Sequence, residues 1–184
     1  MAAARRRWAA ELLHFWFGTL RPRDWFRPAA AIDDELRRRF GRDLAMLSRR
    51  PASEFLTDPL TARAAVLLFD QVPRNIHRGS PRAFATDRLA RAVTHGFLAR
   101  GWDRGLTKAE RQFAAMPLMH SEGIADQQAS LAYYGVLGRR HGFPFARSHH
   151  RMIARFGRFP HRNPVLGRTS TPAEKRAVAA GNAW

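Results

Sequence analysis

The sequence predicts an all-α protein, and three observations carry this prediction. Apolar residues recur at steps of three and four along most of the chain, which is the spacing of one face of an α-helix. Helix start and stop signals stand at the ends of these periodic segments. Alternation of apolar and polar residues, which marks a half-buried strand, is almost absent. We therefore expect about seven or eight helices with short loops, paired as in an α/α solenoid.

The first predicted helix lies near the N-terminus, where Trp8, Leu12 and Phe15 recur at steps of four and three. The basic start of the chain resembles that of a signal peptide. However, Glu11 and His14 interrupt the apolar stretch, and no small-residue cleavage site follows. An amphipathic helix is therefore the better interpretation.

Three further apolar segments follow in order. The first predicts an amphipathic helix and consists of Ile32, Leu36, Phe40, Leu44 and Leu47. Residues 60–72 are apolar on nearly every side, so they predict a central helix. The third predicts the next helix and consists of Phe84, Leu89, Val93 and Phe97.

Local signals place several helix ends. Ser-Pro at residues 80–81 predicts an N-cap followed by proline at the first helical position. Residues 107–110 and 171–174 both fit the capping box, in which a threonine hydroxyl and a glutamate bond free backbone donors reciprocally. The glycine and proline at residues 142–144, and Gly157, are predicted to end helices.

Length and composition favour one soluble domain spanning residues 1–184, because this length suits a single domain and no linker interrupts it. Cysteine is absent, which excludes disulfides and thiolate metal sites. No apolar run approaches the roughly 18–20 residues of a membrane span. Together these features predict a cytoplasmic protein without a membrane span.

The chain is strongly basic, with a formal net charge of +17 from 32 basic and 15 acidic residues. Only Lys108 and Lys175 are lysine, so nearly all the basic residues are arginine. A charge this high attracts polyanions whatever the fold, so charge alone does not identify a nucleic-acid-binding protein.

Three segments are unusually polar for their position, and the first spans residues 69–79. Pro73 disfavours a helical conformation at the residue before it, so we expect the chain to turn there and present Arg74, Asn75 and His77. The alternative is an ordinary helix end whose polar side chains cap carbonyl groups.

The second segment spans residues 117–127, where Ser121 is a natural N-cap. Glu122 and Asp126 are four residues apart and are expected to share a helix face, with His120 just before them. Such a group could bind a divalent cation or form an acid–base pair. The alternative is that acids in a first turn complement the helix dipole. The paired histidines of a zinc site are missing, so we assign no metal ligand, and the sequence does not identify a cofactor.

The third segment lies between Asp126 and Glu174, a stretch with no acidic residue but eight arginines and four histidines. Its centre, residues 155–163, is an expected ordered turn because glycine and proline bracket an aromatic residue. The planar fork of arginine suits bidentate binding of a carboxylate or a phosphate. The partner is either internal, as a buried network with Asp70, Glu122 and Asp126, or an external anion.

These segments resemble the signature of the bacterial domain-of-unknown-function family 924. The motifs that carry the resemblance are residues 15–18, 70–75, 78–79, 83–87, 117–122, 126–127, 155–163 and 166–171. The resemblance spans nearly the whole chain and implies an all-helical fold similar to tetratricopeptide-like α/α superhelices. It implies no activity. Gly123 stands where the family usually has an acid, which weakens any chemistry based on a carboxylate cluster.

Our first functional hypothesis is a small-anion site for a phosphate or a carboxylate, with acid–base catalysis left open. His120 or His161 would transfer the proton, oriented by Glu122 or Asp126. The candidate ligand-binding residues are Asp70, Arg74, Asn75, Asp126, Gln127, Arg155, Arg158, Arg162 and Asn163.

Two alternatives belong to other functional classes. A helical interaction module would bind acidic peptides or proteins in a groove, without turnover. Nucleic-acid binding is permitted by the charge and by phenylalanines among the arginines, which are candidates for base stacking. We do not favour it, because no known nucleic-acid-binding motif appears and phenylalanine is more often a core residue.

Overall fold

The structure, a computed structural model, describes residues 2–181, and Met1 and residues 182–184 lie outside the described part. Helices account for 71% of it, and the described residues form eight α-helices and no strand, which confirms the predicted all-α fold. The helices are α1 (Ala2–Leu13), α2 (Ala30–Leu47), α3 (Pro59–Ile76), α4 (Asp87–Ala99), α5 (Lys108–Met119), α6 (Ile124–Leu137), α7 (Phe143–Phe156) and α8 (Pro172–Ala179). The superhelical arrangement of helix pairs stays a prediction.

The chain divides into two compact units, and the boundary between them falls near the end of α5. Unit 1 consists of Met1–Arg78 and Arg82–Pro117, and unit 2 consists of Gly79–Pro81 and Leu118–Trp184. The single domain expected from length stays a prediction. No described helix has the length and apolarity needed to cross a bilayer, and the cytoplasmic location also stays a prediction.

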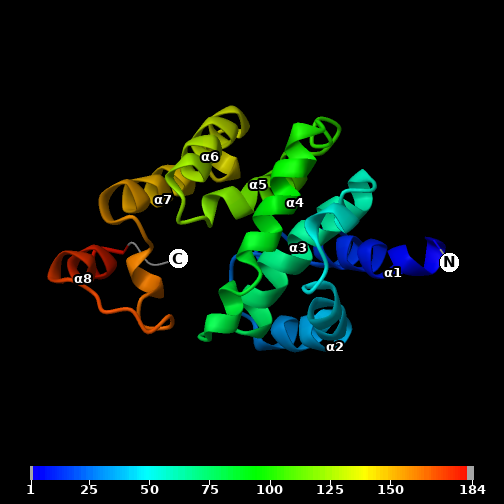
Figure 1. The fold of residues 1–184 in the computed structure, drawn as a ribbon, viewed down its shortest axis with the longest axis horizontal. Helices are drawn as coiled ribbons and strands as arrows, with labels where there is room; N and C mark the ends of the chain where they lie inside the picture. Colours follow the sequence, from blue (N-terminus) through cyan, green and yellow to red (C-terminus); the bar gives the residue numbers. More distant parts are fainter. Residues whose placement is uncertain (1, 182–184) are drawn as a thin grey trace. The chain divides into compact units, whose positions relative to one another are not determined.

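Helix α3 forms the centre of unit 1, as its apolar sequence predicts. Figure 1 shows α3 among α1, α2 and α4, and it contacts all three. Leu67, Leu68 and Phe69 are at most 1% exposed, and each such burial contributes roughly 1.5–3 kcal/mol. The helix starts at Asp58, whose side chain accepts a hydrogen bond of 2.9 Å from the Thr61 amide. Capping and burial therefore both favour this helix.

The turn predicted at Pro73 is wrong, because α3 continues through this residue to Ile76. Proline lacks the N–H that would bond to the carbonyl oxygen of Phe69, four residues earlier. The Thr86 hydroxyl donates to that oxygen instead, at 2.6 Å. The orphaned carbonyl is thus satisfied from outside the helix, and the helix tolerates the proline.

Three of the predicted helix-end signals are confirmed. Thr107 and Glu110 form a capping box, in which the Thr107 amide donates to Glu110 Oε2 at 2.9 Å and the Glu110 amide donates to Thr107 Oγ1 at 3.3 Å. Thr171 and Glu174 form the second capping box, at the start of α8. Gly157 ends α7 in the left-handed conformation, with φ of 67°.

Two predicted boundaries differ from the structure. Gly142 ends only the short 3₁₀ helix η4 (Arg139–His141) and also precedes α7, because proline near the first helical position needs no donor and has a preset φ. Pro81, which follows Ser80, begins only the short 3₁₀ turn η3 (Pro81–Phe84), and α4 begins at Asp87. Helix α4 starts later because Thr86 is not helical and its hydroxyl is bonded to α3.

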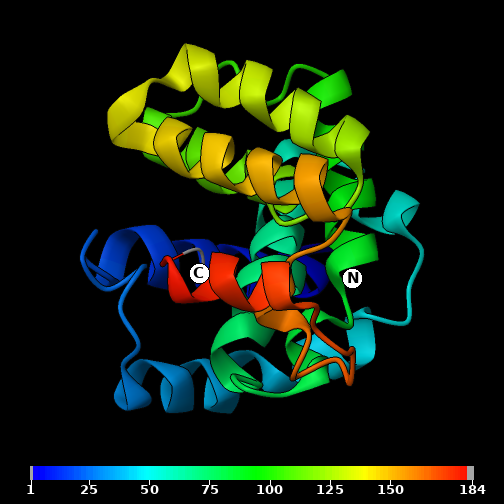
Figure 2. The same ribbon diagram turned by 90° about the vertical axis from the view of Figure 1, so that its left-hand side faces the viewer.

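Unit 2 is built on α6 and α7, which pack against each other. Figure 2 shows these two helices side by side. Helix α8 contacts the 3₁₀ turn η5 (Pro160–Arg162). A small apolar cluster of Met152, Ile153, Phe159 and Ala177 joins α7, the segment after it and α8. The loop after α7, which carries Arg158, Arg162 and Arg168, is therefore anchored at Phe159.

Candidate functional site

In unit 1, the first polar segment forms an internal ion network centred on Arg74. Its Nη1 and Nη2 donate to the two carboxylate oxygens of Asp87 at 2.9 and 3.0 Å, and Nη1 lies 3.2 Å from Asp70 Oδ1. Burial alone would lower the pKa of Arg74, but Asp70 and Asp87 raise it. Asn75 Nδ2 donates to the carbonyl oxygen of Gln71 at 3.0 Å. Three predicted ligand-binding residues thus lie in one network within unit 1.

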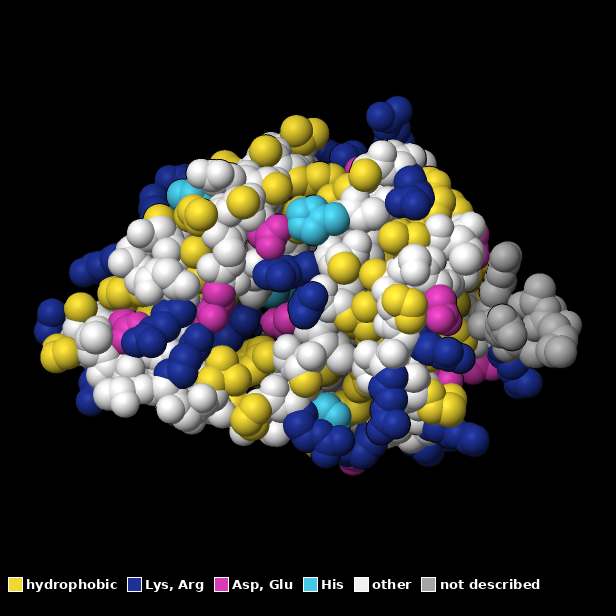
Figure 3. All heavy atoms as spheres, viewed as in Figure 1, with side chains coloured by type: hydrophobic (Ala, Val, Ile, Leu, Met, Phe, Trp, Pro, Cys, Tyr) yellow, Lys and Arg dark blue, Asp and Glu magenta, His cyan; other side chains and the backbone are white. Residues whose placement is uncertain are grey.

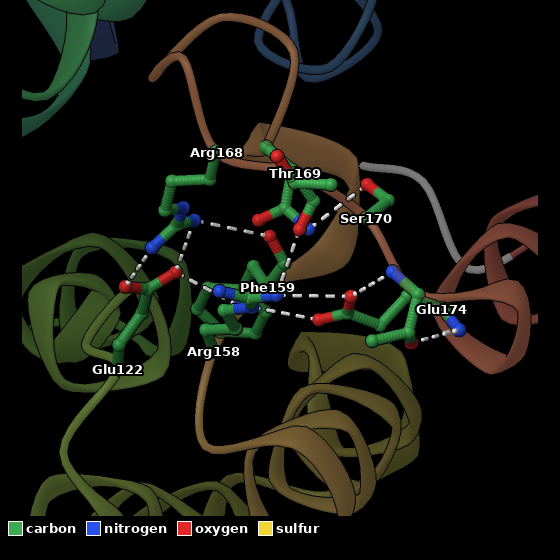
Figure 4. Close-up of polar contacts among 9 residues, drawn as sticks. Glu122, Arg158, Phe159, Arg168, Thr169, Ser170 and Glu174 are labelled. Carbon is green, nitrogen blue, oxygen red and sulfur yellow. Dashed lines mark hydrogen bonds and ion pairs between the residues drawn. The ribbon is translucent and has the colours of Figure 1, made fainter.

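In unit 2, Glu122 holds the Phe159 peptide together with Arg168 (Figure 4). Arg168 donates to both Glu122 oxygens at 2.8 and 2.9 Å, and the Phe159 amide donates to Glu122 Oε1 at 2.8 Å. Arg168 also donates to the Phe159 carbonyl at 3.3 Å. Burial would raise the pKa of Glu122, but the hydrogen bonds from Arg168 and the Phe159 amide lower it. The carboxylate is therefore ionised and bound on both oxygens.

The prediction that Glu122 and Asp126 share a helix face is wrong, because α6 begins only at Ile124 and Glu122 precedes it. The expected N-cap role of Ser121 is also wrong, since Gly123 occupies that position. The Ser121 hydroxyl accepts from the Gly123 amide at 3.0 Å and donates to Asp126 Oδ2 at 2.7 Å. Glu122 faces Arg168, whereas Asp126 faces the serine, so the two acids do not form a pair.

Arg158 is bonded to a carboxylate that the sequence did not single out as its partner (Figure 4). Its Nε and Nη2 donate to the two oxygens of Glu174 at 2.7 and 3.0 Å, and Nη2 also donates to the Thr169 carbonyl at 3.1 Å. The hydrogen bond from Arg158, followed by that from the Thr171 amide, lowers the pKa of Glu174 to about 2. The fork of Arg158 therefore attaches its loop to α8.

Three basic side chains, His149, His161 and Arg162, lie around the ring of Phe159. Together with His120, whose ring lies beside that of His149, we call them the histidine–arginine cluster. The Phe159 ring centroid lies 5.3 Å from that of His149 and 5.6 Å from that of His161. The Arg162 guanidinium carbon lies 4.5 Å from the same centroid. The rings of His120 and His149 are 6.4 Å apart. Arg162 and His149 are only 6% and 5% exposed, so basic groups here are largely removed from water.

His149 and His161 are uncharged at neutral pH. Burial, with a further contribution from the charge of His120, lowers the pKa of His149 to about 3. Burial and the charge of Arg162 lower the pKa of His161 to about 4, against the opposing effect of Glu122. Nδ1 of His149 lies 2.8 Å from the Phe145 carbonyl oxygen, which can only accept, so this nitrogen carries the proton.

The remaining predicted residues occupy distinct environments in unit 2. Arg155 is exposed, with its guanidinium carbon 5.0 Å from the Phe156 ring centroid. Gln127 Nε2 donates to the carbonyls of Met119 and Ser121 at 2.7 and 2.6 Å. Gln127 Oε1 and Asn163 Oδ1 are buried acceptors without a hydrogen-bond partner in the described part of the chain. Each buried acceptor without a partner typically lowers the stability of the folded protein by roughly 1–3 kcal/mol.

The family model described as "Bacterial protein of unknown function (DUF924)" matches residues 12–182. The chain belongs to this family. The DUF924 chain is also similar to a solved structure, the protein of unknown function ATU0120 from Agrobacterium tumefaciens, with 35% identity and a TM-score of 0.90. That match covers 98% of this chain and 100% of the other. A search of curated proteins finds no match.

Sequence reasoning missed three participants in the DUF924 segments: His149, Arg168 as the partner of Glu122, and Glu174 as the partner of Arg158. His149 looks like any polar residue of an amphipathic helix, and no local pattern links it to His120. The family motif at residues 166–171 includes Arg168 and was the one available signal for it. Among the described residues, no group of three His, Asp or Glu side chains could hold a metal ion.

Proposed function

We propose that unit 2 binds a small anion, a phosphate or a carboxylate, at the histidine–arginine cluster. The observation that carries the proposal is that two imidazoles and one buried guanidinium lie around the Phe159 ring, with a third imidazole, that of His120, next to His149. Positive charge in such a buried place disfavours protonation of the neighbouring histidines. An anion would reverse that effect, and it would bind through charge-assisted hydrogen bonds from Arg162 and the imidazoles.

The other predicted residues have supporting roles in this proposal. Glu122 acts as a positioning residue, because together with Arg168 it holds both polar groups of the Phe159 peptide. Arg158 acts through Glu174, by attaching the same loop to α8. We infer that Asp70, Arg74 and Asn75 stabilise unit 1 rather than bind the anion, since Arg74 is bonded to Asp70 and Asp87, and Asn75 to Gln71, all within unit 1.

Acid–base chemistry is the reaction class that fits the cluster best. An uncharged His161 can accept a proton at neutral pH while Arg162 holds the negative charge of the substrate. A covalent mechanism fits less well, because the sequence has no cysteine and the Ser121 hydroxyl donates to Asp126 rather than to a histidine. Here we assign His161 the role of proton acceptor and His120 a role in charge balance.

The test is a titration of the histidine ring signals by NMR, in the presence and absence of inorganic phosphate or acetate. We expect phosphate to raise the pKa values of His149 and His161, because an adjacent negative charge stabilises the imidazolium form. His161→Gln should weaken phosphate binding. His150→Gln is the matched control, because His150 lies on α7 outside the cluster and its loss should leave binding unchanged.

Two results would contradict the proposal. One is that no phosphate or acetate concentration changes the titration of either cluster histidine in the folded wild-type protein. The other is that His150→Gln weakens phosphate binding as much as His161→Gln does, since the anion would then respond only to general basic charge. Circular dichroism at each pH establishes that the measured molecules are folded.

A further inference from the structure

Unit 1 contains a pocket that none of the candidate catalytic or ligand-binding residues line, although His77 of the first polar segment does. Its volume is about 400 Å³, within the roughly 300–1,000 Å³ range of small-molecule sites. It lies between α2, the end of α3 and the segment that leads into α4. We call it the α2–α3 pocket, and its principal lining residues are Arg37, Gly41, Leu44, Ile76, His77 and Arg82.

The pocket combines an apolar floor with a basic rim. Leu44, Pro73 and Ile76 are buried, whereas Arg37 and Arg82 are exposed. Basic side chains gather over α2 along the lower edge of the face in Figure 3. A site with apolar walls and a few charged groups is the usual form of a pocket for small organic ligands.

Arg37 is oriented towards the end of α3 and retains donors for a ligand. Its Nη1 donates to Asp34 at 2.6 Å and its Nη2 donates to the Ile76 carbonyl at 2.9 Å. A guanidinium has five N–H donors, so these two bonds leave others available within the described part of the chain. Burial lowers the pKa of His77, and the charges of Arg82 and Arg37 lower it further, so both arginines act on the imidazole that lines the pocket.

Gly41 gives an independent indication that this space is kept open. It lies inside α2, where glycine costs roughly 1 kcal/mol relative to alanine. A Cβ atom at this position would meet only Arg37 Cγ, at 3.9 Å, which is ordinary contact. Neither its backbone conformation nor close packing therefore requires the glycine, whereas a larger side chain would occupy the pocket that Gly41 lines.

We propose that the α2–α3 pocket binds an amphiphilic organic anion, with a carboxylate or phosphate head held by Arg37 and Arg82. Its apolar body lies against Leu44, Pro73 and Ile76. Carboxylate and phosphate ligands of this kind have the same two parts, a single negative head group and a hydrocarbon body small enough to fit in the pocket. This site is separate from the histidine–arginine cluster, and the proposal does not depend on the function proposed for unit 2.

The test is isothermal titration calorimetry with octanoate and octyl phosphate, with 1-octanol as the uncharged control. We expect both anions to bind the wild-type protein and octanol to bind at least about tenfold more weakly, because it lacks charge-assisted hydrogen bonds. Gly41→Leu should abolish binding of both anions by filling the pocket. This variant should fold, since leucine is a better helix former than glycine.

Matched control variants distinguish binding in the pocket from nonspecific attraction of anions to the basic surface. Ala31→Leu adds the same side chain to an exposed position of α2 outside the pocket and should bind like the wild type. Arg82→Gln should weaken anion binding about tenfold, whereas Arg88→Gln, an exposed arginine that does not line the pocket, should not. Wild-type affinity in Gly41→Leu, or equal losses in Arg82→Gln and Arg88→Gln, would overturn the proposal.

Discussion

Single arginine residues in this protein are positioned by specific carboxylates. Arg158 binds Glu174 with two nitrogens, and Arg74 does the same with Asp87. Each pair joins a helix to another segment, so the planar fork of the guanidinium fixes an orientation as well as a distance. The abundance of arginine in the sequence is therefore partly structural, and a basic residue here is a ligand candidate only after its acidic partners are known.

The buried histidines predict a particular dependence of stability on pH. The pKa of His149 falls from its ordinary value of 6.5 to about 3 in the folded protein. The unfolded chain therefore binds a proton that the folded chain does not, so the free energy of unfolding decreases as the pH falls below about 6.5. We expect His149 to account for a loss of about 2 kcal/mol by about pH 5, where most carboxylates are still ionised.

Urea denaturation at a series of pH values measures this effect. His149→Gln keeps a donor for the Phe145 carbonyl but cannot be protonated, so its stability should change less between about pH 6.5 and pH 5. His150→Gln should follow the wild type. Equal slopes for the wild type and His149→Gln would show that His149 is not the source of the pH dependence.

At the scale of the helix, α3 shows how a tertiary contact replaces a missing backbone donor. Pro73 removes one hydrogen bond of α3, and the Thr86 hydroxyl from the start of α4 restores a bond to the same Phe69 carbonyl. Helices α3 and α4 are therefore joined by a polar contact as well as by apolar packing. The helix keeps its last turn, which places Arg74 beside Asp87.

We predict that Thr86→Val destabilises unit 1 by about 1–3 kcal/mol, because it leaves a buried carbonyl without a donor. Valine has nearly the shape of threonine, so little of this loss would come from packing. Thr86→Ser keeps the hydroxyl and should lose much less stability. Thermal and urea unfolding of the two variants compare these effects, and an equal loss in both would assign it to the methyl group instead.

At the scale of the whole molecule, the dominant property is the net charge of +17. Figure 3 shows basic side chains over much of one face, with acidic side chains among them. Charge of this kind attracts polyanions without a defined site. Nonspecific attraction and binding at a small site therefore have to be distinguished by their response to salt and to single substitutions.

We predict that duplex DNA binds this protein weakly and loses affinity steeply with added salt. The logarithm of the affinity should fall by about 0.9 for each logarithmic unit of salt and each phosphate neutralised. His161→Gln should not change DNA binding, although it should weaken phosphate binding. Fluorescence anisotropy at several salt concentrations measures both, and a DNA affinity that depends on His161 would favour a nucleic-acid site at the cluster.

Much of the fold follows from local sequence, and the errors have identifiable causes. The central helix, both capping boxes and the stop at Gly157 depend on residues within a few positions of each other, so they can be predicted from the chain alone. The turn at Pro73 was predicted wrongly because its compensating donor, Thr86, lies 13 residues away. Similarly, Gly123 rather than Ser121 is the N-cap of α6, so Glu122 precedes the helix.

The sequence by itself determined the helical class, the family and the three polar segments, because periodicity, caps and motifs depend only on residues that are close together in the chain. The tertiary structure decided which carboxylate binds which arginine, since Glu122 meets Arg168 across 46 residues and Arg158 meets Glu174 across 16. It also decided that His149 and His161 lie against one phenyl ring and that His120 lies beside His149. Side-chain pairing and burial depend on how helices pack, and packing is a property of the folded chain rather than of any one segment.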